Sequence, residues 1–174
     1  MAREISRRRL FALATGAAVI FSAGPVFAAR LQTPQGKPVL RIGGKISTHN
    51  QGDEAVFDLS MLEALGTSNF STSTPWTDGV SDWEGVRLDV LMKAVGASGD
   101  TLRATALNDY VADVPLADIG EEGPILAMKR NGELMPISDK GPLFIVYPFD
   151  GNPNLQQQNV YMRCAWHIAR LDVL

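Results

Sequence analysis

Residues 125–137 read ILAMKRNGELMPI, and this stretch decides the fold class. Two short runs flank the pair Asn131 and Gly132, which tolerate the positive φ angles of a type I′ turn. The stretch therefore predicts an antiparallel β-hairpin with a two-residue loop. A chain organised around such a hairpin is built, at least in part, on antiparallel sheet.

The sequence around this hairpin predicts further strands. Apolar and polar residues alternate before it, as in half-buried strands, and a continuous apolar run follows it, as in a buried strand. The expected strands lie at residues 39–47, 55–57, 101–106, 110–114 and 143–147, with a last one around Trp166, Ile168 and Val173.

Two short helices are expected between these strands. Residues 88–95 repeat leucine, methionine and valine at helical spacing, and Gly96 ends the helix. Residues 59–65 predict a second helix, with Asp58 as its N-cap and Gly66 at its end. Because strands outnumber helices, we expect an α+β fold: one compact domain of mainly antiparallel or mixed sheet with short helices.

The first 28 residues have the three-part pattern of a secretory signal peptide. Four arginines precede an apolar run at residues 10–21, and Val26 and Ala28 supply the small residues of a cleavage site after Ala28. The run of 12 residues is shorter than the ~20 that span a bilayer as a helix. We therefore expect cleavage, no membrane insertion afterwards and a periplasmic location. The arginines suit the twin-arginine and the general export route equally.

The remaining chain is expected to hold one linker and one domain. Residues 29–38 contain two prolines and a glycine without an apolar period, which is typical of a linker. One domain then runs over residues 39–174. Its single cysteine, Cys164, cannot form an internal disulfide, and the part-buried pattern of residues 161–168 predicts a buried, unreactive thiol.

Composition and charge exclude several classes of function. The 174 residues are 45% hydrophobic and 20% charged, as in an ordinary soluble globular protein. After residue 28 the chain holds 12 basic and 18 acidic residues, a net charge of −6. An acidic chain without a basic stripe is a poor electrostatic partner for nucleic acid, so we expect no nucleic-acid binding.

Sequence motifs for catalysis are missing. The sequence has no glycine-rich phosphate loop, no nucleophile elbow and no pair of cysteines. Its two histidines, His49 and His167, are too far apart in sequence for a local metal motif. We therefore expect neither catalytic nor metal-ligating residues.

Aromatic and polar residues gather at expected turns, at residues 70–79, 106–110 and 161–166. An indole or a phenol can stack on a flat heterocycle, while an amide, a guanidinium and hydroxyls bond to its polar edge. The same residue types also serve as core anchors, turn residues and members of surface ion pairs. From the residues alone, both interpretations stay open.

Five segments occur in the order found in the molybdopterin-binding domain of the sulfite oxidase family, and the chain resembles that family. They are GVxLxxLxxxxG at residues 85–96, ALNDY at 106–110, PILAxxxNG at 124–132, KGPLxIVYP at 140–148 and the closing stretch 166–174. The resemblance implies a compact α+β fold of mixed sheets that holds a pterin in a surface pocket.

The sequence departs from the catalytic members at one place. In those members a cysteine thiolate on the loop matching residues 70–76 ligates molybdenum, whereas here residues 71–76 read STSTPW. A hydroxyl is a poorer ligand than a thiolate for a soft metal, and Cys164 lies about 90 positions downstream. The chain looks more like an exported branch of the family without this cysteine. Some members are similar to periplasmic pterin-binding proteins that regulate inner-membrane cyclic-di-GMP synthases and phosphodiesterases.

The resemblance implies a sensor that binds a reduced, metal-free pterin and docks on the periplasmic domain of an inner-membrane signalling enzyme. In such a site Trp76 or Trp166 stacks on the ring, Asn108 and Arg163 bond to the pyrimidine edge, and other side chains complete the wall. The expected ligand-binding residues are Ser73, Thr74, Trp76, Asn108, Tyr110, Arg163 and Trp166.

Two alternatives remain open. One is a molybdopterin-dependent oxidoreductase with a ligand other than a thiolate, and the other is an interaction module with a vestigial pocket. The polar segment at residues 149–159 is equally suited to a lid, a partner surface or a connector.

Overall fold

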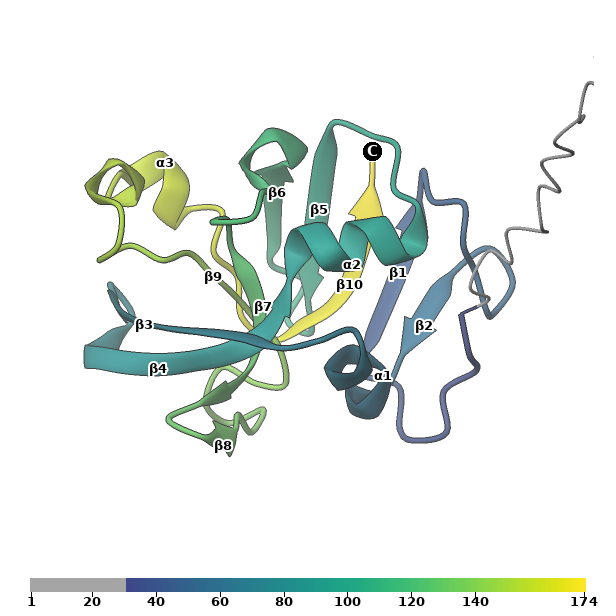
Figure 1. Ribbon diagram of the computed structural model, residues 1–174, viewed down its shortest axis with the longest axis horizontal. Coiled ribbons are helices and arrows are strands. Elements are labelled where there is room, and N and C mark those ends of the chain that lie inside the picture. The colour runs from purple at the N-terminus through teal and green to yellow at the C-terminus, as the bar shows by residue number, and fades with distance from the viewer. Residues whose placement is uncertain (1–30) are drawn as a thin grey trace, which may run out of the picture.

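The computed structural model describes residues 31–174, so the expected signal peptide at residues 1–28 lies outside the described part. Two five-stranded sheets pack around a shared core, with short helices beside them (Figure 1). The first sheet has the order β2-β1-β10-β5-β6 and consists of β1 (Leu40–Gly44), β2 (Ala55–Phe57), β5 (Thr101–Ala106), β6 (Val111–Pro115) and β10 (Ile168–Val173).

The second sheet has the order β3-β4-β7-β8, and its fifth strand, β9, also pairs with β7. It consists of β3 (Ser68–Thr74), β4 (Thr77–Arg87), β7 (Ile125–Arg130), β8 (Glu133–Leu134) and β9 (Phe144–Val146). The helices are α1 (Leu59–Ala64), α2 (Leu88–Val95) and α3 (Gln158–Tyr161), with 3₁₀ turns η1 (Leu116–Asp118) and η2 (Pro153–Leu155).

The expected α+β class is confirmed. Every strand pairing between these elements is antiparallel except that of β1 with β10, which is parallel. The β7–β8 hairpin has the expected two-residue loop, with φ angles of 52° at Asn131 and 82° at Gly132. None of the helices within residues 31–174 combines the length and the apolar character needed to cross a membrane.

Both expected helices form with the expected ends. Asp58 is the N-cap of α1, and one of its carboxylate oxygens accepts the N–H of Met61 at 2.9 Å. Gly96 ends α2 in the left-handed conformation, which a residue without a Cβ adopts at little cost. The apolar side of α2 is buried in the core, as its periodicity predicts.

The structure corrects the interpretation of residues 70–76 as a loop. Residues Ser68–Thr74 form strand β3, and with the eleven-residue strand β4 they make a hairpin whose turn holds Trp76. In β3 the side chains of Thr72 and Thr74 are buried while Ser71 is exposed. Buried and exposed side chains alternate as in any strand. Serine and threonine occupy both faces, however, so the hydropathy of the sequence does not alternate and did not indicate a strand.

Trp83 of β4 lies at the centre of the core. Its side chain is fully buried, its indole N–H donates to the carbonyl of Thr72 at 3.2 Å, and its ring meets Phe144 edge to face at 5.3 Å. The hydrogen bond satisfies the buried indole N–H of Trp83, and the ring contact connects the β3–β4 hairpin to β9.

The described part of the expected linker lies against the domain. The second carboxylate oxygen of Asp58 accepts the backbone N–H of Gln35 at 2.9 Å and of Gly36 at 2.7 Å. Asp58 therefore holds residues 35–36 and the start of α1 together. These N–H groups and the hydroxyl of Ser60 lower the pKa of Asp58 from 3.8 to about 2, with Gly36 contributing most.

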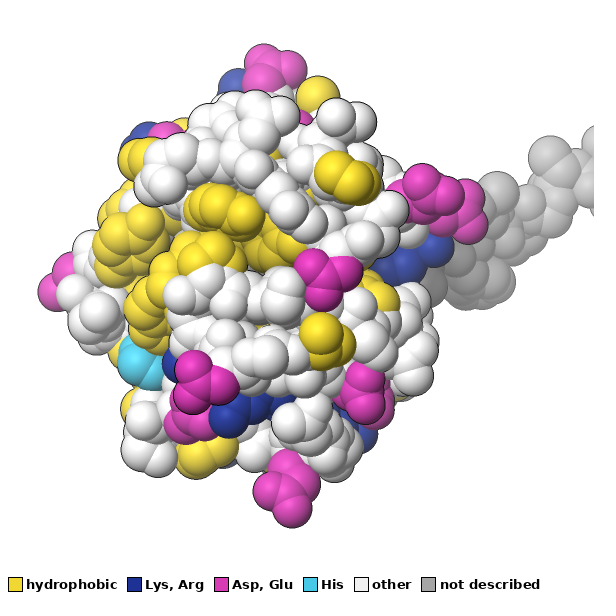
Figure 2. Space-filling view, turned by 90° about the vertical axis from the view of Figure 1, so that its left-hand side faces the viewer, with side chains coloured by type: hydrophobic (Ala, Val, Ile, Leu, Met, Phe, Trp, Pro, Cys, Tyr) yellow, Lys and Arg dark blue, Asp and Glu magenta, His cyan; other side chains and the backbone are white. Residues whose placement is uncertain are grey.

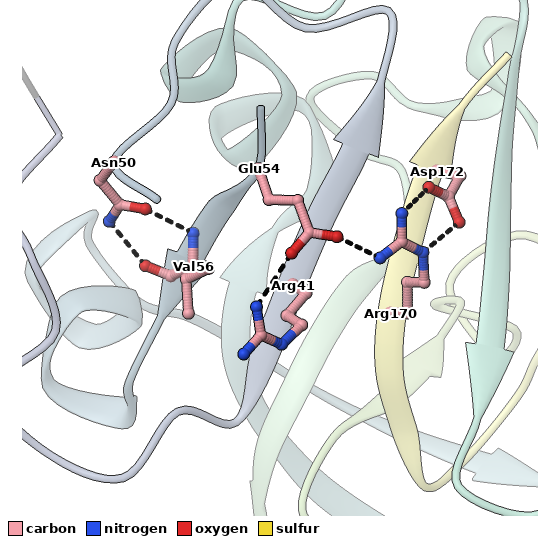
Figure 3. A network of polar contacts seen from close by, with 6 residues as sticks. All are labelled: Arg41, Asn50, Glu54, Val56, Arg170 and Asp172. Carbon is pink, nitrogen blue, oxygen red and sulfur yellow. Dashed lines mark hydrogen bonds and ion pairs between the residues drawn. The ribbon is translucent and has the colours of Figure 1, made fainter. Parts of the chain in front are cut away.

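An ion-pair network crosses the outer face of the first sheet (Figure 3). Glu54, just before β2, accepts from Arg41 of β1 at 2.9 Å and from Arg170 of β10. Arg170 in turn donates twice to Asp172, at 2.7 Å each. These bonds lower the pKa of Glu54, with Arg170 as the main cause. The network aligns three adjacent strands from the solvent side.

We expect Asp58→Asn to destabilise the domain at neutral pH by about 2 kcal/mol, because a neutral amide replaces a carboxylate that accepts from Gln35, Gly36, Ser60 and Met61. The folded pKa lies below that of an unfolded carboxyl. The stabilisation is therefore complete above pH ~4 and is lost as the pH falls toward 2. Urea unfolding of both chains between pH 7 and pH 2 measures this, and a gap that does not narrow in acid would contradict the role of the carboxylate.

We expect Gly85→Ala to destabilise the fold by roughly 1–3 kcal/mol, as overpacked core substitutions do. A Cβ on Gly85 of β4 would lie 2.1 Å from the carbonyl oxygen of Leu126, which belongs to the backbone of β7. Gly120→Ala is the matched control, because a Cβ there meets nothing within 4 Å. Thermal unfolding of the two variants tests this, and equal melting temperatures would show that the β4–β7 approach is not tight.

Candidate ligand-binding site

A cavity of about 300 Å³ opens between the tip of the β3–β4 hairpin, the β5–β6 turn and α3. Figure 2 faces this side of the molecule and shows hydrophobic side chains gathered around a hollow. Its lining residues come from three separate parts of the chain: Trp76, Asn108, Tyr110, Gln158, Tyr161, Met162, Cys164 and Trp166.

Four of the eight lining residues are aromatic. The ring of Trp76 lies 5.7 Å from that of Trp166 and 6.1 Å from that of Tyr161. Phe144 of β9 lies behind them, 6.2 Å from Trp76 and 5.8 Å from Trp166, both edge to face. Packing against Phe144 fixes the two indoles, so the wall is preformed, as is usual for small-molecule sites.

Two carboxamides supply the polar edge. Asn108 lies in the β5–β6 turn, where its side-chain oxygen accepts the N–H of Tyr110 at 3.3 Å, and Gln158 begins α3. A carboxamide offers both donors and acceptors. The lining residues include no Lys, Arg, Asp or Glu. The cavity therefore suits a flat, uncharged heterocycle with donors and acceptors along one edge.

Cys164 is buried at the floor of the cavity, which confirms the expectation of a buried thiol. Its sulfur lies 3.9 Å from the carbonyl oxygen of Val160. Burial raises the pKa of the thiol to about 12. A thiol with such a pKa stays protonated at neutral pH, so it offers neither a nucleophile nor a ready thiolate ligand.

The structure brings four of the seven expected ligand-binding residues together. Trp76, Asn108, Tyr110 and Trp166 all line the cavity. These residues are 90 positions apart at the extremes, and they meet because the hairpin tip, the β5–β6 turn and the approach to β10 converge at one end of the two sheets.

The other three expected residues, Ser73, Thr74 and Arg163, lie outside the cavity lining. The backbone N–H and hydroxyl of Ser73 both bond to Asp150, at 2.6 and 2.7 Å. Thr74 is buried, and its hydroxyl bonds to that of Thr77 at 2.8 Å. The two side chains point to opposite faces of β3, and each is bonded to a residue outside the cavity lining.

Arg163 points to the opposite side of its segment from Cys164. It pairs with Asp118, which also accepts from the hydroxyl of Tyr147 at 3.3 Å. These three residues line a separate cavity of about 280 Å³. Gln158, and not Arg163, supplies a polar side chain to the lining of the aromatic cavity.

Sequence reasoning missed Gln158, Tyr161 and Met162 as parts of the site. The polar segment at residues 149–159 ends in α3, and this four-residue helix provides one wall. Tyr161 packs on Phe149, with 5.1 Å between ring centroids. A tyrosine three residues after Gln158 was the available signal, since the two share a helical face.

A more polar cavity of about 340 Å³ adjoins the first and shares Trp76 with it. Its cations, Arg130 and Lys140, both contact Asp139, at 2.6 and 3.4 Å. Across residues 31–174, no three His, Cys, Asp or Glu side chains are grouped so that they could hold a metal ion.

The fold has a counterpart among solved structures. The sulfane dehydrogenase SoxCD from Paracoccus pantotrophus superposes with a TM-score of 0.57 at 19% identity, over 77% of this chain and 37% of that chain. At this identity the likeness shows the fold alone, and the chain spans well under half of that enzyme. Among curated proteins, no sequence matches the chain.

The family model of the oxidoreductase molybdopterin binding domain matches residues 60–149. The match includes the β3–β4 hairpin with Trp76 and the turn with Asn108 and Tyr110, and it ends before α3. It covers more than half of the chain and agrees with the fold and with the resemblance of the five segments. The chain belongs to the sulfite oxidase-type molybdopterin-binding domain family.

Proposed function

We propose that this protein binds a reduced, metal-free pterin in the aromatic cavity and acts as a ligand sensor. The observation that carries the proposal is the composition of the wall: aromatic rings and two carboxamides without a charged side chain. A pterin is flat, and one edge of it alternates hydrogen-bond donors and acceptors. Family membership supports pterin as the class of ring.

The residues fit the ring of the family's cofactor better than its metal. Thr72, on the hairpin that would supply the thiolate, is fully buried, and its hydroxyl accepts the N–H of Asp150 at 3.0 Å. Thr74 is bonded to Thr77. These hydroxyls are weak ligands for a soft metal, and the thiol of Cys164 is protonated. The donor set therefore does not fit molybdenum.

The regulatory part of the proposal concerns location and partner. The N-terminal pattern of a secretory signal supports a periplasmic protein. The resemblance to regulators of cyclic-di-GMP enzymes supports a partner in the inner membrane. In this scheme the loaded protein docks on the periplasmic domain of a cyclic-di-GMP synthase or phosphodiesterase and changes its activity.

The second candidate function is a molybdopterin-dependent oxidoreductase. Membership of the family favours it, as does the pair of cations, Arg130 and Lys140, next to the aromatic cavity. Those cations share one carboxylate, Asp139, so a phosphate would have to compete with it.

We expect protein purified from its native periplasm to release a pterin without molybdenum when it is denatured. Mass spectrometry of the released molecule and metal quantification on the same sample measure this directly. A stoichiometric amount of molybdenum with a pyranopterin would contradict the sensor and establish the oxidoreductase. An empty cavity would favour an interaction module.

We expect Asn108→Ala to weaken binding of a tetrahydropterin about tenfold, the loss of one to two hydrogen bonds. Trp76→Ala should abolish binding, because it removes a wall of the cavity. Asn154→Ala, at an exposed position outside the cavity, is the matched control. Titration calorimetry on variants whose circular dichroism is unchanged tests this, and equal affinities of all three for the pterin would place the site elsewhere.

A further inference from the structure

Strand β6 forms one edge of the first sheet, beside the aromatic cavity. The N–H of Ala106 donates to the carbonyl of Tyr110 at 2.9 Å, which sets the alternation of bonds between β5 and β6. Ala112 and Val114 then bond to β5, whereas Val111 and Asp113 direct their N–H and C=O groups away from the sheet.

Side chains close parts of two other sheet edges. At the edge of β2, the amide of Asn50 bonds to both the N–H and the C=O of Val56, at 2.8 Å each (Figure 3). At the edge of β3, Asp150 accepts the N–H of Ser73 at 2.6 Å. Within residues 31–174, neither the N–H of Val111 nor that of Asp113 has an acceptor. An edge with unpaired backbone groups is a template for another strand.

Exposed apolar side chains follow this edge and continue to the mouth of the cavity. They are Leu107, Tyr110, Val111 and Met162, which are 47–61% exposed. Tyr110 and Met162 also line the cavity. A strand added to β6 would cover these side chains and pass beside the bound ligand, which links docking to ligand occupancy.

The edge is also acidic. Residues 104–128, which run from the end of β5 through β6 to the start of β7, hold five carboxylates and neither Lys nor Arg. Arg103, Arg163 and Arg87 from other segments pair with three of them. The remaining two, Asp109 and Glu122, form no ion pair among residues 31–174. The surroundings of β6 therefore favour a positively charged partner.

We propose that β6 is a docking edge that takes an extended, basic segment of another protein as an added strand. Backbone bonds to Val111 and Asp113 give the affinity, apolar residues of the segment cover the exposed side chains, and lysine or arginine faces the carboxylates. Pro115 has no N–H, so the edge offers two donors and limits the pairing to the end of β6 near the cavity. The inference deepens the proposed regulatory function by naming the interface, and it rests on that function for its partner.

The test uses a blocked peptide of alternating valine and lysine as probe, with a peptide of alternating valine and glutamate as its control. Amide hydrogen exchange of the protein, followed by NMR, is measured with each peptide. We expect the valine–lysine peptide to slow exchange at Val111 and Asp113 at least tenfold, and the valine–glutamate peptide to leave both amides unchanged. Equal effects of the two peptides, or no protection at either amide, would overturn the proposal.

Asp113→Pro removes one outward N–H and the ion pair with Arg103, while the backbone bonds to β5 remain, and it should weaken peptide binding about tenfold. Asp113→Asn keeps the N–H and is the matched control, expected to bind within a few-fold of the parent chain. If the proline variant does not fold, the amide exchange of Val111 and Asp113 in the parent chain still tests the proposal. A dimer joined at β6, detected by light scattering, would replace the partner by a second copy and overturn the proposal as stated.

The peptide experiment is run on ligand-free and on pterin-loaded protein. Protection at β6 in protein that binds no pterin would leave the docking edge standing while the sensor function fails. Pterin binding without protection at β6 would overturn the docking edge and leave pterin binding standing.

Discussion

Strand β10 is the element on which the rest of the structure depends, because it pairs with β1 on one side and with β5 on the other. Its pairing with β1 is parallel, and parallel neighbours need a long crossover. Here the crossover includes the whole second sheet. The chain enters β10 through Cys164 and Trp166, which are held against β9 by the bond from the N–H of Ile145 to the carbonyl of Ala165. The register of β10 therefore also sets the floor of the cavity.

The cavity is a product of tertiary structure. Trp76, Asn108 and Trp166 each lie at the end of a different strand pairing, and no two are neighbours in sequence. Residue types indicated what kind of molecule such side chains could hold, but only the meeting of the two sheets places them around one space. The charged residues of the same face lie next to the aromatic cavity, in ion pairs of their own.

The sequence predicted best where local chemistry dominates. Asn131 and Gly132 specify a turn, Asp58 specifies the start of a helix and Gly96 the end of one, and each acts through its own backbone or its next few neighbours. The β3 strand was missed because its alternation is carried by hydroxyl groups, which are polar on both faces. Arg163 lies outside the aromatic cavity because its side chain pairs with Asp118, a residue 45 positions away that no local pattern connects to it.

The wall formed by α3 differs in kind from the rest of the cavity. The helix has four residues and no side-chain cap, and it rests on the contact of Tyr161 with Phe149. So short a helix has little stability of its own, whereas Trp76 and Asn108 on the other walls lie in turns that join paired strands. For a ring bound as proposed, opening of α3 would therefore be the cheapest route of exit. If the proposed function holds, substitutions in this single turn of helix would change how long a ring stays bound and leave Trp76, Asn108 and Trp166 on the other walls unaltered.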